Sequence, residues 1–497
     1  MAPILMKSTK NKSILSNEGY VYHHHSFNKG KTREYWRCER RSVCNARCIT
    51  SVGCLENVAE LVIFKCDTSK HLHPPDTSMI QVREIVQSIK ETAKNQPNAT
   101  PSTVIRQNLQ NVSNEEILMR LPQKNALKRV VNLQQNLGRP RIPQSLNDVV
   151  IDHPYSHTKN DEPFLIFDNG AGSPERIIIF STESNVKILG NSDTIFSDGT
   201  FKSVPNQFLQ LYTLHGLFMG VVLPLVYMLC SNKTEDTYNV LYQQLKIYAV
   251  SINVHLHFQH ALTDFEIGNM NALRRAFDGI QINGCLFHFG QSLWRQIVNR
   301  GLRNAYLDTE NSEIRKHLLE LMALPFIPEE DLVATFDSLV EEIHEDVLEF
   351  AEYIERTYVR GRRGRGRRRA VPPLFPPRVW NSYTLVLENR HRTNNVVEGF
   401  HSKFNRLVGT YHANVWKFIE KLRDVQEETE QNIVQKRGGH NISAPVNKTY
   451  VTNQDRVKAI VERYAQYKGE GEVKTYLRAL AYHLKLHSNP QRPEPNY

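Results

Sequence analysis

The stretch IFSDGTF at residues 195–201 is an apolar, strand-like run that leads into an aspartate followed by glycine. This pattern predicts that the carboxylate of Asp198 lies at a strand edge and faces a cleft. Two later segments also bring a carboxylate to the boundary of a predicted element: LTDFE around Asp264 and RTNNVVEGFH around Glu398. Three converging carboxylates can hold the two divalent cations that catalyse cleavage and joining of phosphodiesters. Together the three segments make the chain a candidate for DNA processing.

Each of these carboxylates, taken alone, is explained more simply by local structure. Asp198 precedes glycine, and Asp-Gly is a common turn dipeptide. Asp264 could cap the N-terminus of a helix that begins near Glu266. Glu398 stands three residues after Asn395, the spacing of a capping box. The functional hypothesis therefore depends on the three occurring together.

The composition favours a polyanionic partner. The chain has 497 residues, a formal net charge of +10 and a pI of about 9.1, which suits nucleic acid. Residues 360–369 hold seven arginines and no acid, and without those seven charges the +10 falls to +3. The run is predicted to contact DNA phosphates and to serve in addition as a nuclear import signal; its alternative is a solvated, disordered stretch. The candidate DNA contacts are Arg360, Arg362, Arg363, Arg365, Arg367, Arg368 and Arg369.

No membrane or secreted class is indicated. The first residues lack the apolar core of a signal peptide. Residues 211–230 are mostly apolar, but Gly216, Gly220 and Pro224 interrupt them. Two buried strands joined by a turn are predicted there in place of a transmembrane helix. Seven cysteines, most of them near the N-terminus of an intracellular chain, suggest metal binding more than disulfides.

The cysteine-rich region carries a local motif. The order is Tyr35-Trp36-Arg37-Cys38, then Cys44, then His71-x-His73, and it resembles the FLYWCH zinc finger. The resemblance implies that Cys38, Cys44, His71 and His73 bind a structural Zn²⁺ in a closed tetrahedral site. The interval before His71 is long, which leaves Cys48 or Cys66 as replacement ligands. A cysteine-rich segment without metal is the structural alternative.

The three carboxylate segments, with GCLFH at residues 284–288 between the second and third, resemble the DDE transposase domain of Mutator-like elements. The similarity extends over roughly residues 186–422. It implies that Asp198, Asp264 and Glu398 are catalytic ligands of Mg²⁺ or Mn²⁺, with Glu266 as a neighbour of the site.

The same resemblance brings in three residues whose roles stay open. Cys285 and His288 form a family marker of unknown role, near the active site; otherwise they are a buried thiol and a satisfied histidine. Trp294 could stack on an unpaired DNA base, although a tryptophan at this position is more often part of a core.

The pattern of elements predicts an α/β fold: an RNase H-like DDE catalytic core with an all-helical insertion, preceded by a small β-rich zinc finger. Strands and helices alternate from about residue 186 to 297, whereas 302–358 has helical periodicity and no obvious strand. The predicted segments are a FLYWCH-type finger (7–76), a helical or linker region (77–185), the first part of the core (186–298), a helical insertion with the arginine-rich loop (299–385), a core return helix (386–425) and a helical tail (426–497).

The sequence thus predicts a nuclear Mutator-like DNA transposase that binds double-stranded DNA through its finger. It would cut and transfer strands at element ends, and bringing two ends together implies a homo-oligomer. The alternative is a regulator derived from such an enzyme, which binds DNA while its catalytic core is idle.

Overall fold

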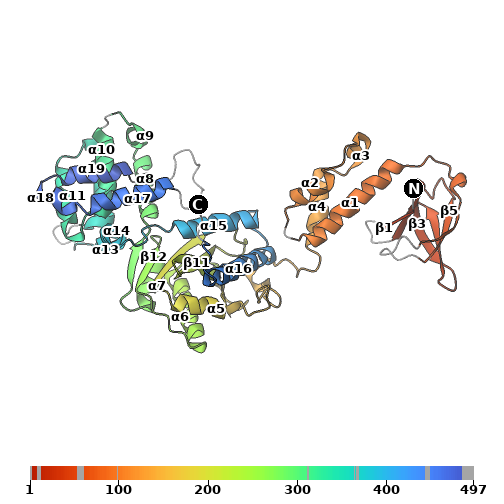
Figure 1. Ribbon diagram of the computed structural model, residues 1–497, viewed down its shortest axis with the longest axis horizontal. Helices are drawn as coiled ribbons and strands as arrows, with labels where there is room; N and C mark the ends of the chain where they lie inside the picture. The colour runs from red at the N-terminus through yellow and green to blue at the C-terminus, as the bar shows by residue number, and fades with distance from the viewer. Residues whose placement is uncertain are drawn as a thin grey trace. The chain divides into compact units, whose positions relative to one another are not determined.

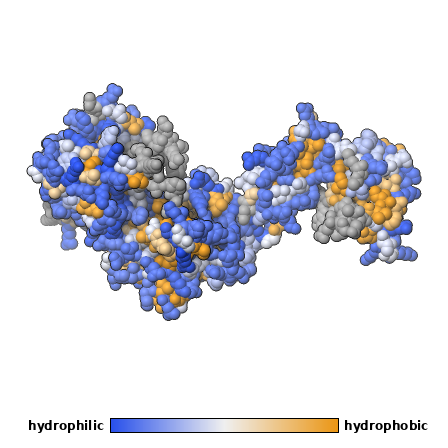
Figure 2. Space-filling view, viewed as in Figure 1, coloured by the Kyte–Doolittle hydropathy of each residue, from blue (hydrophilic) through white to orange (hydrophobic). Residues whose placement is uncertain are grey.

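The computed structural model describes residues 3–7, 13–52, 61–97, 99–310, 313–362, 364, 369–442 and 448–483 (Figure 1). They divide into two compact units, residues 1–141 and 142–497. Hydrophilic side chains dominate the face of the molecule in Figure 2. Within the described ranges, no helix is long and apolar enough to cross a membrane.

The first unit opens with a β-rich finger, as predicted. Its six strands form an antiparallel meander in sequence order. Alternate residues of the strands, among them Leu15, Tyr22, Trp36 and Cys48, are buried on one face and form its core, because side chains alternate along a strand. The strands are β1 (Ile4–Lys7), β2 (Ser13–Asn17), β3 (Tyr20–Phe27), β4 (Arg33–Cys38), β5 (Arg47–Ser51) and β6 (Ile63–Cys66).

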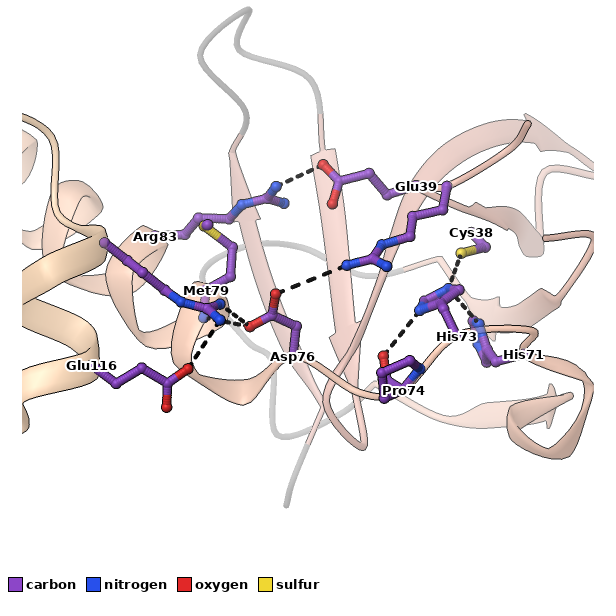
Figure 3. A network of polar contacts seen from close by, with 11 residues as sticks. Cys38, Glu39, His71, His73, Pro74, Asp76, Met79, Arg83 and Glu116 are labelled. Atoms are coloured by element: carbon purple, nitrogen blue, oxygen red, sulfur yellow. Dashed lines mark hydrogen bonds and ion pairs between the residues drawn. The ribbon is translucent and has the colours of Figure 1, made fainter. Parts of the chain in front are cut away.

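A helical module completes the first unit. Its helices are α1 (Thr77–Asn95), α2 (Pro101–Leu109), α3 (Glu115–Arg120) and α4 (Lys124–Gln135), and α1, α2 and α4 share a small core. Ile80 of α1 packs against Met6, Ile14 and Val21 on the second face of the finger sheet. Asp76 caps α1 by accepting the N–H of Met79 at 3.1 Å, and it pairs with Arg120 of α3 (Figure 3). The helices are therefore folded onto the finger and do not form a loose connector.

The second unit is built on a seven-stranded sheet of order β13-β12-β9-β10-β11-β8-β7. Strands β9, β10, β11, β8 and β7 pair antiparallel, whereas β12 and β13 run parallel to β9. The predicted pair of strands within residues 211–230 is present as β10 and β11. The strands are β7 (Leu165–Asp168), β8 (Ile177–Phe180), β9 (Thr194–Thr200), β10 (Gln210–Phe218), β11 (Val221–Cys230), β12 (His260–Thr263) and β13 (Gln281–Gly284).

Helices cover both faces of this sheet. Residues of α5 (Glu183–Gly190), α6 (Glu235–Ser251) and α7 (Ile267–Ala276) share one core with Ile177 and Ile179 of β8. Residues of α15 (Asn395–Val408) and α16 (Val415–Arg437) share another with Ile178 and Phe180. Burial on both faces explains the unbroken apolar run in β8.

The sheet begins earlier in the chain than the predicted core, which starts at residue 186. Both β7 and β8 precede that residue and pair with the sheet. Each has four residues, and a short apolar run carries no period that distinguishes a strand from a buried helical segment. The place of β8 is set by pairing with β11, about fifty residues downstream, and β7 pairs with β8.

The segment after the sheet is helical, and the C-terminal helices pack against it. Tyr476 of α19 donates to the carbonyl of Phe326 at 2.6 Å, and Arg478 pairs with Glu320 at 2.5 Å. One helical body therefore contains both the predicted insertion and the predicted tail. Its helices are α8 (Leu286–Asn299), α9 (Arg303–Leu307), α10 (Glu313–Met322), α11 (Glu329–Glu341), α12 (Leu348–Ile354), α13 (Pro377–Trp380), α14 (Tyr383–Leu387), α17 (Lys448–Val461), α18 (Tyr464–Gly469) and α19 (Val473–His483).

Candidate functional sites

The first candidate site is a cluster of two thiols and two imidazoles in the finger. Cys38 ends β4, Cys44 lies in the following hairpin loop, and His71 and His73 follow β6. Cys38 Sγ lies 3.2 Å from His73 Nε2, which is 3.2 Å from His71 Nδ1 (Figure 3). Cys44 Sγ lies 3.3 Å from His71 Nδ1. All four ligand atoms lie within 4.8 Å of one another. Zinc bonds of about 2.0–2.3 Å in a tetrahedron fit these separations, so the cluster suits a structural Zn²⁺.

Neighbouring groups orient both imidazoles toward the centre of this cluster. Tyr22 Oη lies 2.9 Å from His71 Nε2, and the ring of Tyr20 stacks on His71 at 3.7 Å. His73 Nδ1 donates to the carbonyl of Pro74 at 3.0 Å. Each histidine therefore has one ring nitrogen engaged and the other free to bind metal, as is usual for zinc ligands. Burial, then the charge of His73, lowers the pKa of His71 to about 4, which keeps this ring neutral.

The alternative ligands Cys48 and Cys66 lie outside the cluster. They face each other across β5 and β6, and Cys66 Sγ contacts Asn17 Nδ2 at 3.5 Å and Tyr22 Oη at 3.3 Å. Neither is among the four residues whose ligand atoms converge.

The second candidate site lies where β9 and β12 meet the start of α15. Asp198 lies within β9, and not in a turn. Leu262 of β12 pairs with Phe196 in parallel register, which brings Asp264 level with Asp198 two residues further on. Glu398 lies in the first turn of α15. Three segments distant in sequence therefore converge near the carboxyl ends of β9 and β12.

The capping alternatives are not formed. The N-cap position of α7 is Glu266 and not Asp264, and the Glu266 side chain makes no capping hydrogen bond. The N-cap of α15 is Asn394, and its side-chain amide donates to the carbonyl of Ser197 at 2.9 Å instead of closing a capping box. Among the described residues, Glu398 Oε1 is buried and accepts no hydrogen bond, and His288 Nε2 lies 3.6 Å from it. A buried carboxylate oxygen without a hydrogen bond needs another source of compensation, and a hard cation is one that fits.

The three carboxylates influence one another electrostatically. Burial, then the charges of Glu266 and Asp198, holds the pKa of Asp264 well above its usual range. Burial, then Asp198, raises the pKa of Glu398 to about 7. Burial alone would raise the pKa of Asp198, but the hydrogen bond and charge of His401 outweigh it and hold that pKa below its usual value. Mutually repelling acids at one site are typical of a place where divalent cations bind, and an all-oxygen donor set fits Mg²⁺ or Mn²⁺. Glu266 is engaged elsewhere, with Tyr238 Oη and with Lys233 at 3.3 Å.

Cys285 and His288 connect this site to α8. The N–H of Asn394 donates to Cys285 Sγ at 3.2 Å, and the N–H of Leu286 donates to the carbonyl of Arg392 at 2.9 Å. Burial raises the pKa of the Cys285 thiol to about 12, so the sulfur is a neutral acceptor. One turn along α8, His288 Nε2 lies 3.6 Å from Glu398 Oε1. Cys285, His288 and Glu398 place their ligand atoms within 4.8 Å of one another, and the pair fixes the segment that carries Glu398.

His401 is a site residue to which the sequence assigned no role. It is 6% exposed, its Nδ1 lies 3.5 Å from Asp198 Oδ2, and its Nε2 is hydrogen-bonded to Thr213 Oγ1 at 3.0 Å. His215 Nε2 bonds the same hydroxyl at 3.1 Å. This buried chain holds the Asp198 carboxylate from the side of β10. A signal was present, since His401 follows Glu398 by three residues and such residues share a helix face.

The remaining predicted DNA contacts are placed differently. Trp294 is 6% exposed and meets Tyr306 edge to face at 5.2 Å, so it belongs to the core and cannot receive a DNA base. Arg360 is paired with Asp337 and with Glu355, which occupies its guanidinium within the helical body. Arg362 and Arg369 are exposed. The others, Arg363, Arg365, Arg367 and Arg368, lie outside the described residues.

Comparison with protein-family models gives two matches. Residues 194–292 match the MULE transposase domain, and residues 5–73 match the FLYWCH zinc finger domain. Both resemblances seen in the sequence are thereby confirmed. The first match runs from β9 into α8, and the second contains all four residues of the finger cluster. No curated protein matches the chain.

Proposed function

We propose that this chain is a metal-dependent DNA transposase of the Mutator-like type, which cuts and transfers DNA strands at the ends of an element. The observation that carries the proposal is the convergence of Asp198, Asp264 and Glu398, with Glu398 Oε1 buried and without a hydrogen bond. The match of residues 194–292 to a transposase domain supports it.

An RNase H-like architecture is part of this proposal. Three antiparallel strands in sequence, β9 to β11, are followed by α6, the parallel strand β12, α7 and the parallel strand β13. This order matches the succession expected of such a core. The acidic residues then come from the first strand, the end of the fourth strand and a later helix, after the helical insertion.

In this proposal the protein holds the reacting DNA in place and organises the acidic site. Mg²⁺ or Mn²⁺ bound by Asp198, Asp264 and Glu398 would supply the positive charge that activates water and offsets charge on the phosphate. His401 and Thr213 hold the Asp198 carboxylate, while Cys285 anchors the chain just before Glu398. Such supports keep ligand oxygens in a fixed arrangement during catalysis.

The chemistry requires two displacements at phosphorus. Water attacks the phosphodiester at the element end, and the bond to the 3′-oxygen breaks, which leaves a 3′-hydroxyl. That hydroxyl attacks a phosphodiester of target DNA, and the target's own 3′-oxygen leaves. No covalent link between protein and DNA is needed, and no nucleophilic side chain is required at the site. Joining both ends in one complex implies at least a dimer, and action on chromosomal DNA implies the nucleus.

A strand-transfer assay tests the proposal. The substrate is DNA taken from the sequences that flank the gene, together with a plasmid target and Mg²⁺. The full-length chain is expected to nick the flanking DNA and join it to the plasmid, whereas Asp198→Ala should do neither and still bind DNA. A wild-type chain that binds this DNA and never cuts it would favour a DNA-binding regulator with an idle core.

A further inference from the structure

The second face of the finger sheet is divided into a covered half and an open half. Cross-strand pairing places Met6, Ile14, His23, Arg37 and Arg47 in one row across β1 to β5. Helix α1 covers the β1–β3 end of this row, where Ile80 packs on Met6 and Ile14. At the β4–β5 end, Arg47 is exposed and Arg37 is half-buried.

The open half is basic and partly apolar. Arg37 and Arg47 stand directly opposite each other, and the next outward-facing pair in the same ladder is Tyr35 and Ile49. Arg41 lies in the hairpin loop between the two strands and is exposed. The residues between these positions, such as Trp36 and Cys48, point to the core on the other face.

Two like charges directly opposite each other destabilise an antiparallel pair. An anion bound between Arg37 and Arg47 would offset this repulsion. Among the residues that the structure describes, neither Arg37 nor Arg47 has an ion pair, and the buried Arg37 Nε has no hydrogen-bond partner. Burial first, and then the charges of Arg37, Arg47 and Arg41, lower the pKa of His25, so all three arginines add to the positive charge at this part of the sheet.

Two acids border this surface, and both are paired with other residues. The N–H of Asp67 donates to the carbonyl of Arg47 at 3.1 Å. The Asp67 carboxylate, however, pairs with Lys65 at 3.9 Å and with Lys70 at 3.6 Å.

The second acid is Glu39. Glu39 follows Cys38 directly, but it is paired with Arg83 of α1 at 2.6 Å (Figure 3). It also pairs with His23 at 3.3 Å. Both partners of the Glu39 carboxylate belong to the half of the face that α1 covers. The open half keeps its positive charge.

We propose that Arg37, Arg41 and Arg47, with Tyr35 and Ile49 beside them, form the surface by which the finger contacts the backbone of duplex DNA. The inference rests on the proposed DNA-processing function and names the surface that serves it. Planar guanidinium groups bind phosphate oxygens in pairs, and strands of a sheet can lie against a DNA duplex.

The metal cluster holds this surface in place from the opposite face. Cys38 follows Arg37 in β4, and Cys44 lies in the same hairpin as Arg41. Zinc would therefore fix the β4–β5 hairpin without touching DNA. Loss of zinc should weaken DNA binding because the arginines are no longer held together.

The test measures binding of the full-length, zinc-loaded chain to a short mixed-sequence DNA duplex over a range of KCl concentrations. The double variant Arg37→Gln/Arg47→Gln should weaken binding about tenfold and reduce the slope of log K against log salt by about two, since each lost phosphate contact removes about one unit. The matched control is Arg106→Gln/Arg129→Gln, which removes the same charge from exposed positions on α2 and α4 and should change neither quantity. Arg37→Lys/Arg47→Lys, which keeps both charges, should retain most of the slope.

Zinc content and the melting curve show whether each variant is folded. If the glutamine variant is folded, holds zinc and binds with the wild-type slope, this surface is not the DNA contact. If Arg37→Gln/Arg47→Gln and the control Arg106→Gln/Arg129→Gln weaken binding equally, the change in net charge explains the effect. The proposed surface is then also refuted. Strand transfer by the wild type is measured independently of these variants. The proposed DNA-binding surface can therefore be refuted while the proposed transposase function holds. A wild-type chain that binds no duplex overturns both.

Discussion

The finger cluster and the acidic site are both candidate metal centres, but they are built in opposite ways. The finger gathers four ligand atoms from residues 38–73, and the engaged ring nitrogens of His71 and His73 orient both rings. The acidic site draws its carboxylates from three segments that are up to two hundred residues apart. In the described part of the chain, the three do not approach one another as closely as the four finger ligands.

The difference follows from charge. Thiols and neutral imidazoles can be packed together by the fold alone, whereas carboxylates repel and burial penalises them. In the core, His401, Cys285 and His288 therefore support the segments that carry Asp198 and Glu398. Burial and the neighbouring carboxylates raise the pKa of Asp264 and of Glu398. A closed site of the first kind stabilises a fold. An acidic site of the second kind suits cations that exchange and keep positions open for substrate.

The largest effect is expected from the finger. Cys38→Ser should abolish zinc binding and unfold the finger, because structural zinc contributes on the order of 10 kcal/mol to such modules. Metal analysis and thermal melting of the full chain measure this, and the melting of the second unit should be unchanged. Cys66→Ser is the control, since Cys66 lies outside the cluster, and it should retain one zinc. Equal zinc loss in both variants would place the site elsewhere among the cysteines.

The next effect concerns catalysis. Glu398→Gln keeps the shape of the side chain and removes the charge that a hard cation requires. The variant should melt almost as the wild type does yet lose DNA cleavage by about a thousandfold or more, as the loss of a metal ligand implies. Glu388→Gln, at an exposed position in the preceding segment, should cleave normally. Wild-type cleavage by Glu398→Gln would return Glu398 to a structural role.

A smaller effect is expected at His401, which supports a ligand without being one. His401→Gln should weaken Mn²⁺ binding in the core by about 10- to 100-fold, the usual range for a residue that orients a metal ligand. Cleavage should recover at high Mn²⁺, which would not happen if the residue only stabilised the fold. The control is His412→Gln. In the wild type, the ring of His412 is hydrogen-bonded to the carbonyl of Val204. A His401→Gln protein with lowered stability and unchanged Mn²⁺ affinity would contradict the positioning role.

The smallest effect is a pH dependence that only the acidic site should show strongly near neutrality. Because the pKa of Glu398 is raised to about 7, the carboxyl is protonated below pH 7 and must release a proton to bind a cation. Mn²⁺ affinity should therefore rise with pH through about 7, by about tenfold per unit for each proton released, and the raised pKa of Asp264 adds to the rise. Calorimetry at several pH values measures this. A flat profile between pH 6 and 8, taken as about one unit on either side of the pKa, would show that no carboxyl that binds the cation titrates in this range.

Sequence predicted the two regions unequally well. The finger motif falls within one short stretch and resembles a known family, so its four ligands could be named, although the long interval before His71 left Cys48 and Cys66 open. Its strands alternate cleanly. The pair β10 and β11 was also predictable, because apolar runs broken by glycine mark a hairpin. The short strands β7 and β8 were not, since β8 depends on pairing with β11 and β7 on pairing with β8.

The supports of the acidic site were the hardest to predict. Cys285 acts through the backbone N–H of Asn394, and His401 acts through Thr213, both across more than a hundred residues of chain. Neither contact has a local pattern. Trp294 and Arg360 are residue types that suit DNA contact, and the sequence therefore predicted such contacts. In the structure Trp294 packs against Tyr306 and Arg360 pairs with Asp337 and Glu355.

Counting Mn²⁺ ions by electron paramagnetic resonance shows whether Asp198, Asp264 and Glu398 hold divalent cations. Zinc-loaded wild type and the Asp198→Asn/Glu398→Gln variant are titrated with Mn²⁺ at pH 8, above the pKa of Glu398. The wild type should bind two Mn²⁺ ions that Mg²⁺ displaces, while its zinc stays in the finger, as expected for a two-metal site. The variant should keep its zinc and bind no Mn²⁺ in the core. Equal Mn²⁺ binding by both proteins would contradict the account, because the cations would then be held by residues other than these carboxylates.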